Sequence, residues 1–157
     1  MPTTVTGFRA PYRLLVVANE ALDADPSPVN AVADRHDRPR LEVLVVAPAA
    51  AGWLERWTDD DRPRRAAEDR LRRCLHALHR EGVQAEGMIG DGDSLRAIDD
   101  ALRLFDADEV LVATCPGPRS GEVAVAFVEE ARRRYPRRVS HVVADAARVD
   151  RPEPVAA

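Results

Sequence analysis

The chain has 157 residues, with 27 acidic residues against 23 basic ones and a formal net charge of −4. All of the basic residues are arginines, so the chain contains no lysine. The length is that of one ordinary domain with a substantial core. The absence of lysine excludes a phosphate-binding loop of the G-x-x-x-x-G-K-[ST] type and any lysine Schiff-base chemistry. The acidic balance argues against general nucleic-acid binding.

Targeting and redox signals are also missing. The apolar runs are far shorter than the roughly 18 residues of a membrane span, and Met1–Tyr12 lacks the apolar stretch of a signal peptide. The two cysteines, Cys74 and Cys115, form neither a disulfide framework nor a zinc pattern. We therefore expect a cytoplasmic protein that binds no metal. We also expect a single domain over residues 1–157, with its core at 11–145 and tails at 1–10 and 146–157.

Five short apolar runs predict β-strands. In chain order they are Arg13–Ala18, Leu41–Ala47, Val83–Ile89, Glu109–Thr114 and Val139–Ala144. Four of them are rich in valine and leucine with little alternation, which is typical of strands covered on both faces. The third run is polar and weak, so it predicts an edge strand.

Helical segments lie between these runs. The first is at most a short helix within Val29–Asp37. The others, in chain order, are Arg64–Glu81, Ser94–Phe105 and Gly121–Tyr135. The second has the clearest pattern, because its apolar residues recur on one helical face. Gly82 then predicts a left-handed C-terminal cap. Asp93 or Ser94 is expected to cap the third helix and Ser120 the fourth.

Alternating elements of these lengths predict an open α/β fold, with a five-stranded parallel sheet and helices on both faces. The expected strand order is 3-2-1-4-5, which reverses between the first and fourth strands. Ligands of such sheets lie outside the carboxyl ends of the strands at this reversal. The candidate site is therefore formed by the loops that follow Ala18, Ala47, Ile89 and Thr114.

The loop from Thr114 to Gly121 is the most informative candidate. It leaves a central strand and enters a helix, so its backbone N–H groups can bind a phosphate, with Arg119 as a charged fork. The alternative is an ordinary turn. Two prolines that supply no N–H donors, and the carboxylate of Glu122 in the first helical turn, favour that alternative.

Other polar residues near the expected site have simpler interpretations. Asp91 and Asp93 could bind a ribose hydroxyl or a cation, but Asp93 is well placed to cap a helix. Cys115 could act as a thiolate, although no histidine is evident as its base, and a small apolar role is favoured. His141 is expected to face a helix layer or an interface. Trp53 and Trp57 are expected to pack on the neighbouring helix.

Residues 11–145 resemble the universal stress protein family. The resemblance is carried by RLLVVANEAL at 13–22, LEVLVVAPA at 41–49, GDGDSLRAIDDALRLFDADEVLVAT at 90–114 and RVSHVVAD at 138–145. It implies the open five-stranded fold described above. It also implies a homodimer in which the last strand, Val139–Ala144, forms the interface.

The resemblance also implies an adenine-nucleotide pocket for ATP or AMP, although the ATP motif G-x2-G-x9-G-[ST] is incomplete. Gly117 and Gly121 are four residues apart rather than three, no glycine follows them, and Asn19 stands where ATP-binding members carry an aspartate. The residues expected to line a nucleotide are Ala18, Asn19, Val46, Ala47, Gly90, Thr114, Gly117, Arg119, Ser120 and Gly121.

Two functional hypotheses follow. The first is a dimeric stress-associated regulatory protein with an adenine-nucleotide pocket at the reversal. The second is a protein-interaction module in which this pocket is vestigial. An enzyme is disfavoured, because no base, metal site or activated nucleophile is evident and there is no lysine to support phosphoryl transfer.

Overall fold

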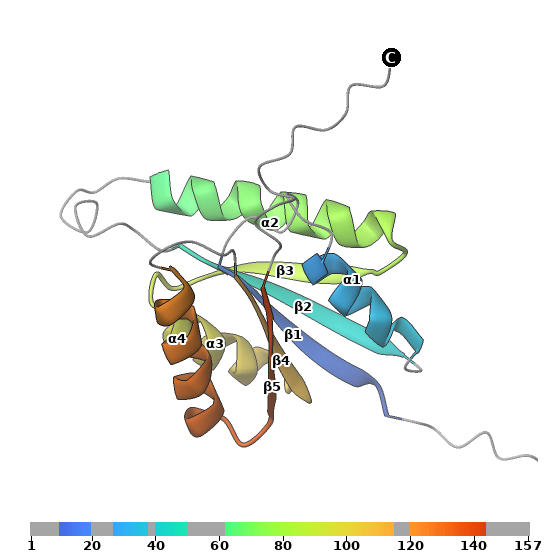
Figure 1. The fold of residues 1–157 in the computed structure, drawn as a ribbon. Helices are drawn as coiled ribbons and strands as arrows, with labels where there is room; N and C mark the ends of the chain where they lie inside the picture. Colours follow the sequence, from blue (N-terminus) through green and yellow to red (C-terminus); the bar gives the residue numbers. More distant parts are fainter. Residues whose placement is uncertain (1–9, 20–26, 38–39, 50–61, 115–119, 144–157) are drawn as a thin grey trace, which may run out of the picture.

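The computed structural model describes residues 10–19, 27–37, 40–49, 62–114 and 120–143. Strands and helices alternate along these ranges (Figure 1). In chain order the elements are β1 (Tyr12–Ala18), α1 (Ser27–Ala33), the 3-10 turn η1 (Asp34–Asp37), β2 (Leu41–Pro48), α2 (Arg62–Arg80), β3 (Ala85–Gly90), α3 (Ser94–Leu104), β4 (Glu109–Thr114), α4 (Ser120–Arg134) and β5 (Arg138–Val143).

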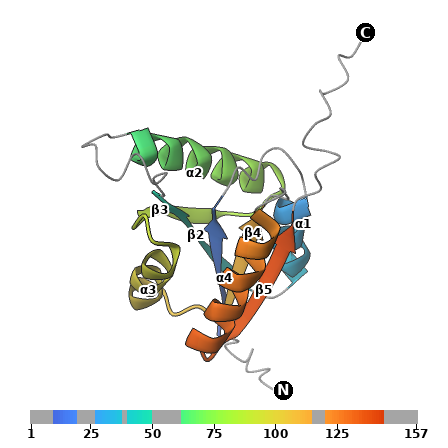
Figure 2. The same cartoon turned by 60° about the vertical axis from the view of Figure 1, so that its left-hand side comes forward.

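The five strands form one parallel sheet in the order β3-β2-β1-β4-β5. Helices α1 and α2 cover one face of the sheet, and α3 and α4 cover the other (Figures 1 and 2). The predicted fold class, strand order and edge position of the third strand are confirmed. Among the described residues, no helix is long and apolar enough to cross a membrane.

Alternate residues of the central strands divide the core into two layers. In β1, Leu14 and Val16 face α1 and α2, whereas Leu15 and Val17 face α3 and α4. All four side chains are at most 1% exposed. This burial on both faces explains why the strand segments appear in the sequence as continuous apolar runs.

The element boundaries differ from the prediction by one or two residues at most elements, and Ser120, expected to cap the fourth helix, is instead its first residue. Two of the differences have a clear cause. Helix α1 begins at Ser27, earlier than expected, because Pro28 lies in the first turn, where a proline removes no helical hydrogen bond. Strand β3 begins at Ala85 rather than Val83, because the Val83 N–H donates to the Leu78 carbonyl at 2.9 Å. That bond closes α2 at Gly82, which has a φ of 78°, as the predicted left-handed cap requires.

The amino ends of the strands hold a buried carboxylate. Glu109 begins β4, and its side chain is 1% exposed. It accepts hydrogen bonds from the Arg35 guanidinium at 2.7 and 3.0 Å, the Tyr12 hydroxyl at 2.6 Å and the Ser140 hydroxyl at 2.7 Å. Burial opposes its ionisation, but these donors together outweigh that cost and lower the pKa of Glu109 to about 2. We call this set of four residues the Glu109 cluster.

Candidate functional site

The carboxyl ends of β1 and β4 lie side by side, because Ala18 pairs with Ala113 in the parallel register. The connections after these two strands run in opposite directions across the sheet, toward β2 and β5 respectively. Helices α3 and α4 begin at this edge of the sheet, so their N-terminal N–H groups are directed toward it. The structure therefore forms the strand reversal that the sequence predicted as the candidate site.

Four polar side chains gather at this edge on the face covered by α3 and α4. They are Asn19, Ser94, Thr114 and His141, and we call them the polar quartet. They come from four separate parts of the chain: the end of β1, the start of α3, the end of β4 and β5. Only the fold brings them together.

The first pair of the quartet joins β1 to α3. The Ser94 hydroxyl donates to the Asn19 side-chain oxygen at 3.1 Å, and both residues are partly exposed. The neighbouring Asp93 caps α3, because its side chain accepts from the N–H groups of Leu95 and Arg96 at 3.0 and 3.5 Å. The Asp91 carboxylate accepts from the Asp93 N–H at 2.8 Å. The predicted cap at Asp93 is confirmed.

The second pair joins β4 to β5. The Thr114 Oγ1 lies 2.8 Å from the His141 Nε2, and Thr114 is 7% exposed. Burial, and then the positive charge of Arg132 on α4, lower the pKa of His141 below its ordinary value. The imidazole is therefore held toward its neutral form, in which it can either donate to a hydroxyl or accept from one. His141 faces the α4 layer, which is one of its two predicted positions.

A third contact at this edge comes from the opposite helical layer. Arg70 of α2 donates from Nε to the Ala18 carbonyl at 2.9 Å and from Nη2 to the Pro48 carbonyl at 2.7 Å. One guanidinium thus bridges the ends of β1 and β2. The sequence analysis missed Arg70, because it is one of many arginines in an exposed helical pattern and nothing local distinguishes it.

The remaining predicted site residues contribute mainly backbone. Ala18, Val46 and Ala47 are each 0% exposed. Gly90 ends β3, and a Cβ atom added there would lie 2.6 Å from the Ala97 Cβ and 2.9 Å from the Val46 Cγ2. A glycine is needed at this position because α3 approaches the strand too closely for any side chain.

Part of the predicted site lies outside the described residues. Gly117 and Arg119 belong to this part. The expectations for Cys115, Trp53 and Trp57 also fall on residues outside the described ranges. Ser120 and Gly121 are placed in the first turn of α4, although their side chains are not described. Within the described ranges, no group of three or more histidine, cysteine or acidic side chains is arranged to hold a metal ion.

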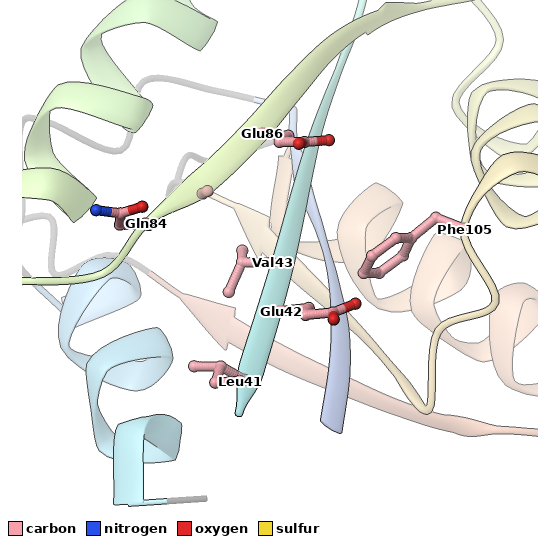
Figure 3. Close-up of a pocket in the computed structure, with 7 residues that line it drawn as sticks. Leu41, Glu42, Val43, Gln84, Glu86 and Phe105 are labelled. Carbon is pink, nitrogen blue, oxygen red and sulfur yellow. The ribbon is translucent and has the colours of Figure 1, made fainter. Parts of the chain in front are cut away.

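A cavity of about 500 Å³ lies at the opposite end of the sheet, where β2 and β3 begin (Figure 3). Figure 3 shows Glu42 and Phe105 on one side of β2, with Leu41 and Val43 on the other. The Glu42 carboxylate is paired with Arg13 at 3.1 Å, and the Arg13 guanidinium lies 5.9 Å from the centre of the Phe105 ring. The Glu42 carboxylate is therefore already engaged within the chain, and this cavity is remote from the strand reversal.

Comparison with known proteins identifies the fold. The universal stress protein from Archaeoglobus fulgidus in complex with dAMP matches with a TM-score of 0.57 and 18% identity, over 84% of this chain and 97% of that one. Another structure of universal stress protein from this organism gives 0.59 and 16%, over 85% and 98%. A universal stress protein family protein from Arabidopsis thaliana, with AMP bound, gives 0.56 and 16%, over 92% and 97%. No family model and no curated protein matches the sequence.

Proposed function

We propose, from the universal stress protein fold of this chain, that it is a regulatory protein of that type and binds an adenine nucleotide at the carboxyl ends of β1 and β4. The observation that carries the proposal is the polar quartet, which four parts of the chain bring to the strand reversal. The structures bound to dAMP and AMP share the fold, and this supports the choice of an adenine nucleotide.

The chemistry of the edge suits a nucleoside phosphate. The N-termini of α3 and α4 provide backbone N–H groups and a positive dipole end for the phosphate. Asn19, Thr114 and His141 can form hydrogen bonds with sugar hydroxyls and phosphate oxygens. No lysine is needed for binding of this kind, because helix N-termini and neutral donors hold the anion.

The test is a calorimetric titration of the purified protein with AMP, dAMP and ATP. We expect saturable binding by at least one of them, and a loss of about tenfold in affinity when Asn19→Ala or Thr114→Val removes one hydrogen-bonding group. Glu42→Gln, at the far end of the sheet, is the matched control and should retain the wild-type affinity. No binding at millimolar nucleotide would refute the proposal.

Homodimerisation through β5 is part of the proposed function. This strand forms one edge of the sheet, and Val143 on it is 50% exposed. An edge strand with an exposed apolar side chain is able to pair with a second copy. We expect light scattering to report a dimer that Val143→Asp converts to monomer. Leu104→Asp, at a residue that is 78% exposed on α3, should leave the dimer intact. A wild-type monomer would contradict this part of the proposal.

The second candidate function is an interaction module whose pocket is vestigial. The full burial of Ala18, Val46 and Ala47 favours it, because these residues offer a ligand no accessible surface. It predicts that the dimer persists while the nucleotide titration shows no binding. The same two experiments therefore separate the two candidates.

A further inference from the structure

The cavity at the amino ends of β2 and β3 is lined by a carboxylate that no described residue neutralises. Glu86 of β3 is exposed, and its side chain forms no ion pair or hydrogen bond with any residue in the described ranges. The other carboxylate of the lining, Glu42, is paired with Arg13 at 3.1 Å. The lining together with this ion pair therefore carries one excess negative charge, located at Glu86.

Glu86 shares its side of the sheet with an aromatic ring. It pairs in register with Leu44, whose side chain belongs to the core layer under α3 and α4. Glu42 precedes Leu44 by two residues and is therefore directed to the same face, and Phe105 packs against the same core layer. Figure 3 shows the two carboxylates and the ring on one side of β2. The excess charge therefore lies beside an apolar wall.

The chain already holds one organic cation at this place. The Arg13 guanidinium pairs with Glu42 and lies 5.9 Å from the centre of the Phe105 ring. Carboxylates and aromatic rings both attract such a cation, and the rings also pack against its apolar stem. Arg13 satisfies one of the two carboxylates on this side of β2. The second carboxylate, Glu86, offers the same kind of partner to a cation that comes from outside the chain.

We propose that this side of the cavity binds a small aliphatic amine, with its ammonium group at Glu86 and its alkyl chain against Phe105. The whole cavity, about 500 Å³, has the size of a small-molecule site. Its lining lies on both sides of β2, so a small ligand fits the side of Glu86. A metal ion is disfavoured, because the described residues include no group of three ligands and much of the lining is apolar.

The test is an NMR titration with three probes that share one alkyl chain: pentylamine, pentan-1-ol and pentanoate. Their head groups are positive, neutral and negative. We expect pentylamine to bind about fivefold more tightly than pentan-1-ol, which is the size of one exposed ion pair. Pentanoate should bind more weakly than either. The dissociation constants should be millimolar, as for other ligands of this size, and the amide signals of Glu86 and Phe105 should shift most.

Two variants change the charge at this one exposed position. Glu86→Gln removes the charge and keeps the shape, so pentylamine and pentan-1-ol should bind about equally. Glu86→Lys reverses the charge, so pentanoate should bind more tightly than pentylamine. The matched control is Glu129→Gln, which makes the same change at an exposed residue of α4 and should retain the wild-type ratio. The ratio of affinities is the decisive readout, because a disturbed fold would weaken the binding of all three probes.

Each outcome is assigned. A preference for pentylamine that is lost in Glu86→Gln and reversed in Glu86→Lys supports the proposal. Equal binding of pentylamine and pentan-1-ol by the wild-type protein overturns it, and so does a preference that Glu86→Gln leaves intact. Absence of any shift at Glu86 and Phe105 on addition of pentylamine also overturns it. The proposed nucleotide site is tested separately, because it lies at the opposite end of the strands.

Discussion

The amino ends and the carboxyl ends of the strands hold their polar side chains in opposite ways. We call these two ends of the sheet its amino edge and its carboxyl edge. At the amino edge, Glu109 is 1% exposed and accepts from three different side chains within 3.0 Å. At the carboxyl edge, the polar quartet forms two separate pairs at 2.8 and 3.1 Å. The first arrangement satisfies a charge completely inside the protein. The second leaves capacity for further hydrogen bonds, and three of its residues, Asn19, Ser94 and His141, are partly exposed.

The comparison separates polar residues that stabilise the fold from polar residues that are able to bind a ligand. A buried and saturated carboxylate has no capacity left for a ligand, so the Glu109 cluster is part of the framework despite its charge. The polar quartet contributes less to stability, and its residues are therefore available for binding. Substitutions at the amino edge should mainly lower stability, and those of the quartet should mainly lower affinity.

The largest expected effect is at Glu109. Glu109→Gln keeps the shape of the side chain but leaves Arg35, 19% exposed, without its charged partner. We expect the free energy of unfolding to fall by about 3 kcal/mol, as for other broken buried ion pairs. Urea denaturation measures this loss. Glu42→Gln, which breaks an exposed pair with Arg13, is the control and should cost less than about 1 kcal/mol.

The pH dependence gives a second test at the same residue. The pKa of Glu109 is lowered from 4.5 to about 2 in the folded protein. Its contribution to stability is therefore complete above pH 4.5 and is lost as the pH falls toward 2. In Glu109→Gln this part of the acid-induced loss should disappear. An equally steep loss in the variant would contradict the role assigned to the Glu109 cluster.

The next effect concerns the close approach of α3 at the carboxyl edge. Gly90→Ala places a Cβ 2.6 Å from the Ala97 Cβ, and we expect a loss of about 2 kcal/mol in urea denaturation. Gly82→Ala is the control for backbone strain alone, because its Cβ meets no atom within 4 Å and only its φ of 78° opposes a side chain. It should cost about 1 kcal/mol. Equal losses would indicate that α3 moves aside freely.

A smaller effect is expected at the cap of α3. Asp93→Ala leaves the N–H groups of Leu95 and Arg96 without their acceptor and should lower the free energy of unfolding by about 1 kcal/mol. Asp93→Asn retains a capping oxygen and should retain most of the stability. Thermal unfolding of the two variants measures the difference, and a fully destabilised Asp93→Asn would mean that charge rather than capping is responsible.

The smallest effect is the titration of His141. Its pKa is lowered in the folded state, so protonation opposes folding and stability declines as the pH falls below the ordinary value of 6.5. NMR titration of the imidazole signals, assigned with His141→Gln, should show a pKa below that value. Nucleotide binding should raise this pKa, because a phosphate near the ring favours the charged form. An unchanged value in the complex would place the phosphate away from His141.

The fold was predictable because it depends on patterns that are local in the sequence. The continuous apolar runs indicate strands that are buried on both faces. The polar third run indicates the edge strand β3. Gly82 and Asp93 were predicted as caps because such caps use conformation and chemistry within a few residues. The start of α1 was predicted after Pro28, because prolines usually interrupt helices. A proline is compatible with the first helical turn, and α1 therefore begins earlier, at Ser27.

The polar contacts were predictable only in part, because they join residues far apart in the chain. Arg70 reaches a carbonyl 52 residues away, and no local property distinguishes it from its neighbours on α2. Glu109 offered a signal that was not used, since an acid in an otherwise apolar strand run needs a buried partner. That partner, Arg35, is 74 residues distant, so the sequence alone does not identify it.

The position of β1 has a consequence for synthesis of the chain. This strand is made first but lies in the middle of the sheet, and the backbone of Arg13 meets Asp108, 95 residues later. At usual rates of translation, its second neighbour follows after roughly 5 to 20 seconds. During this interval β1, β2 and β3 can pair with one another, but the side of β1 that later pairs with β4 has no partner. An unpaired apolar strand of this kind can associate with other chains. β1 is therefore the strand of this sheet at which we expect the nascent chain to be most prone to association with other chains.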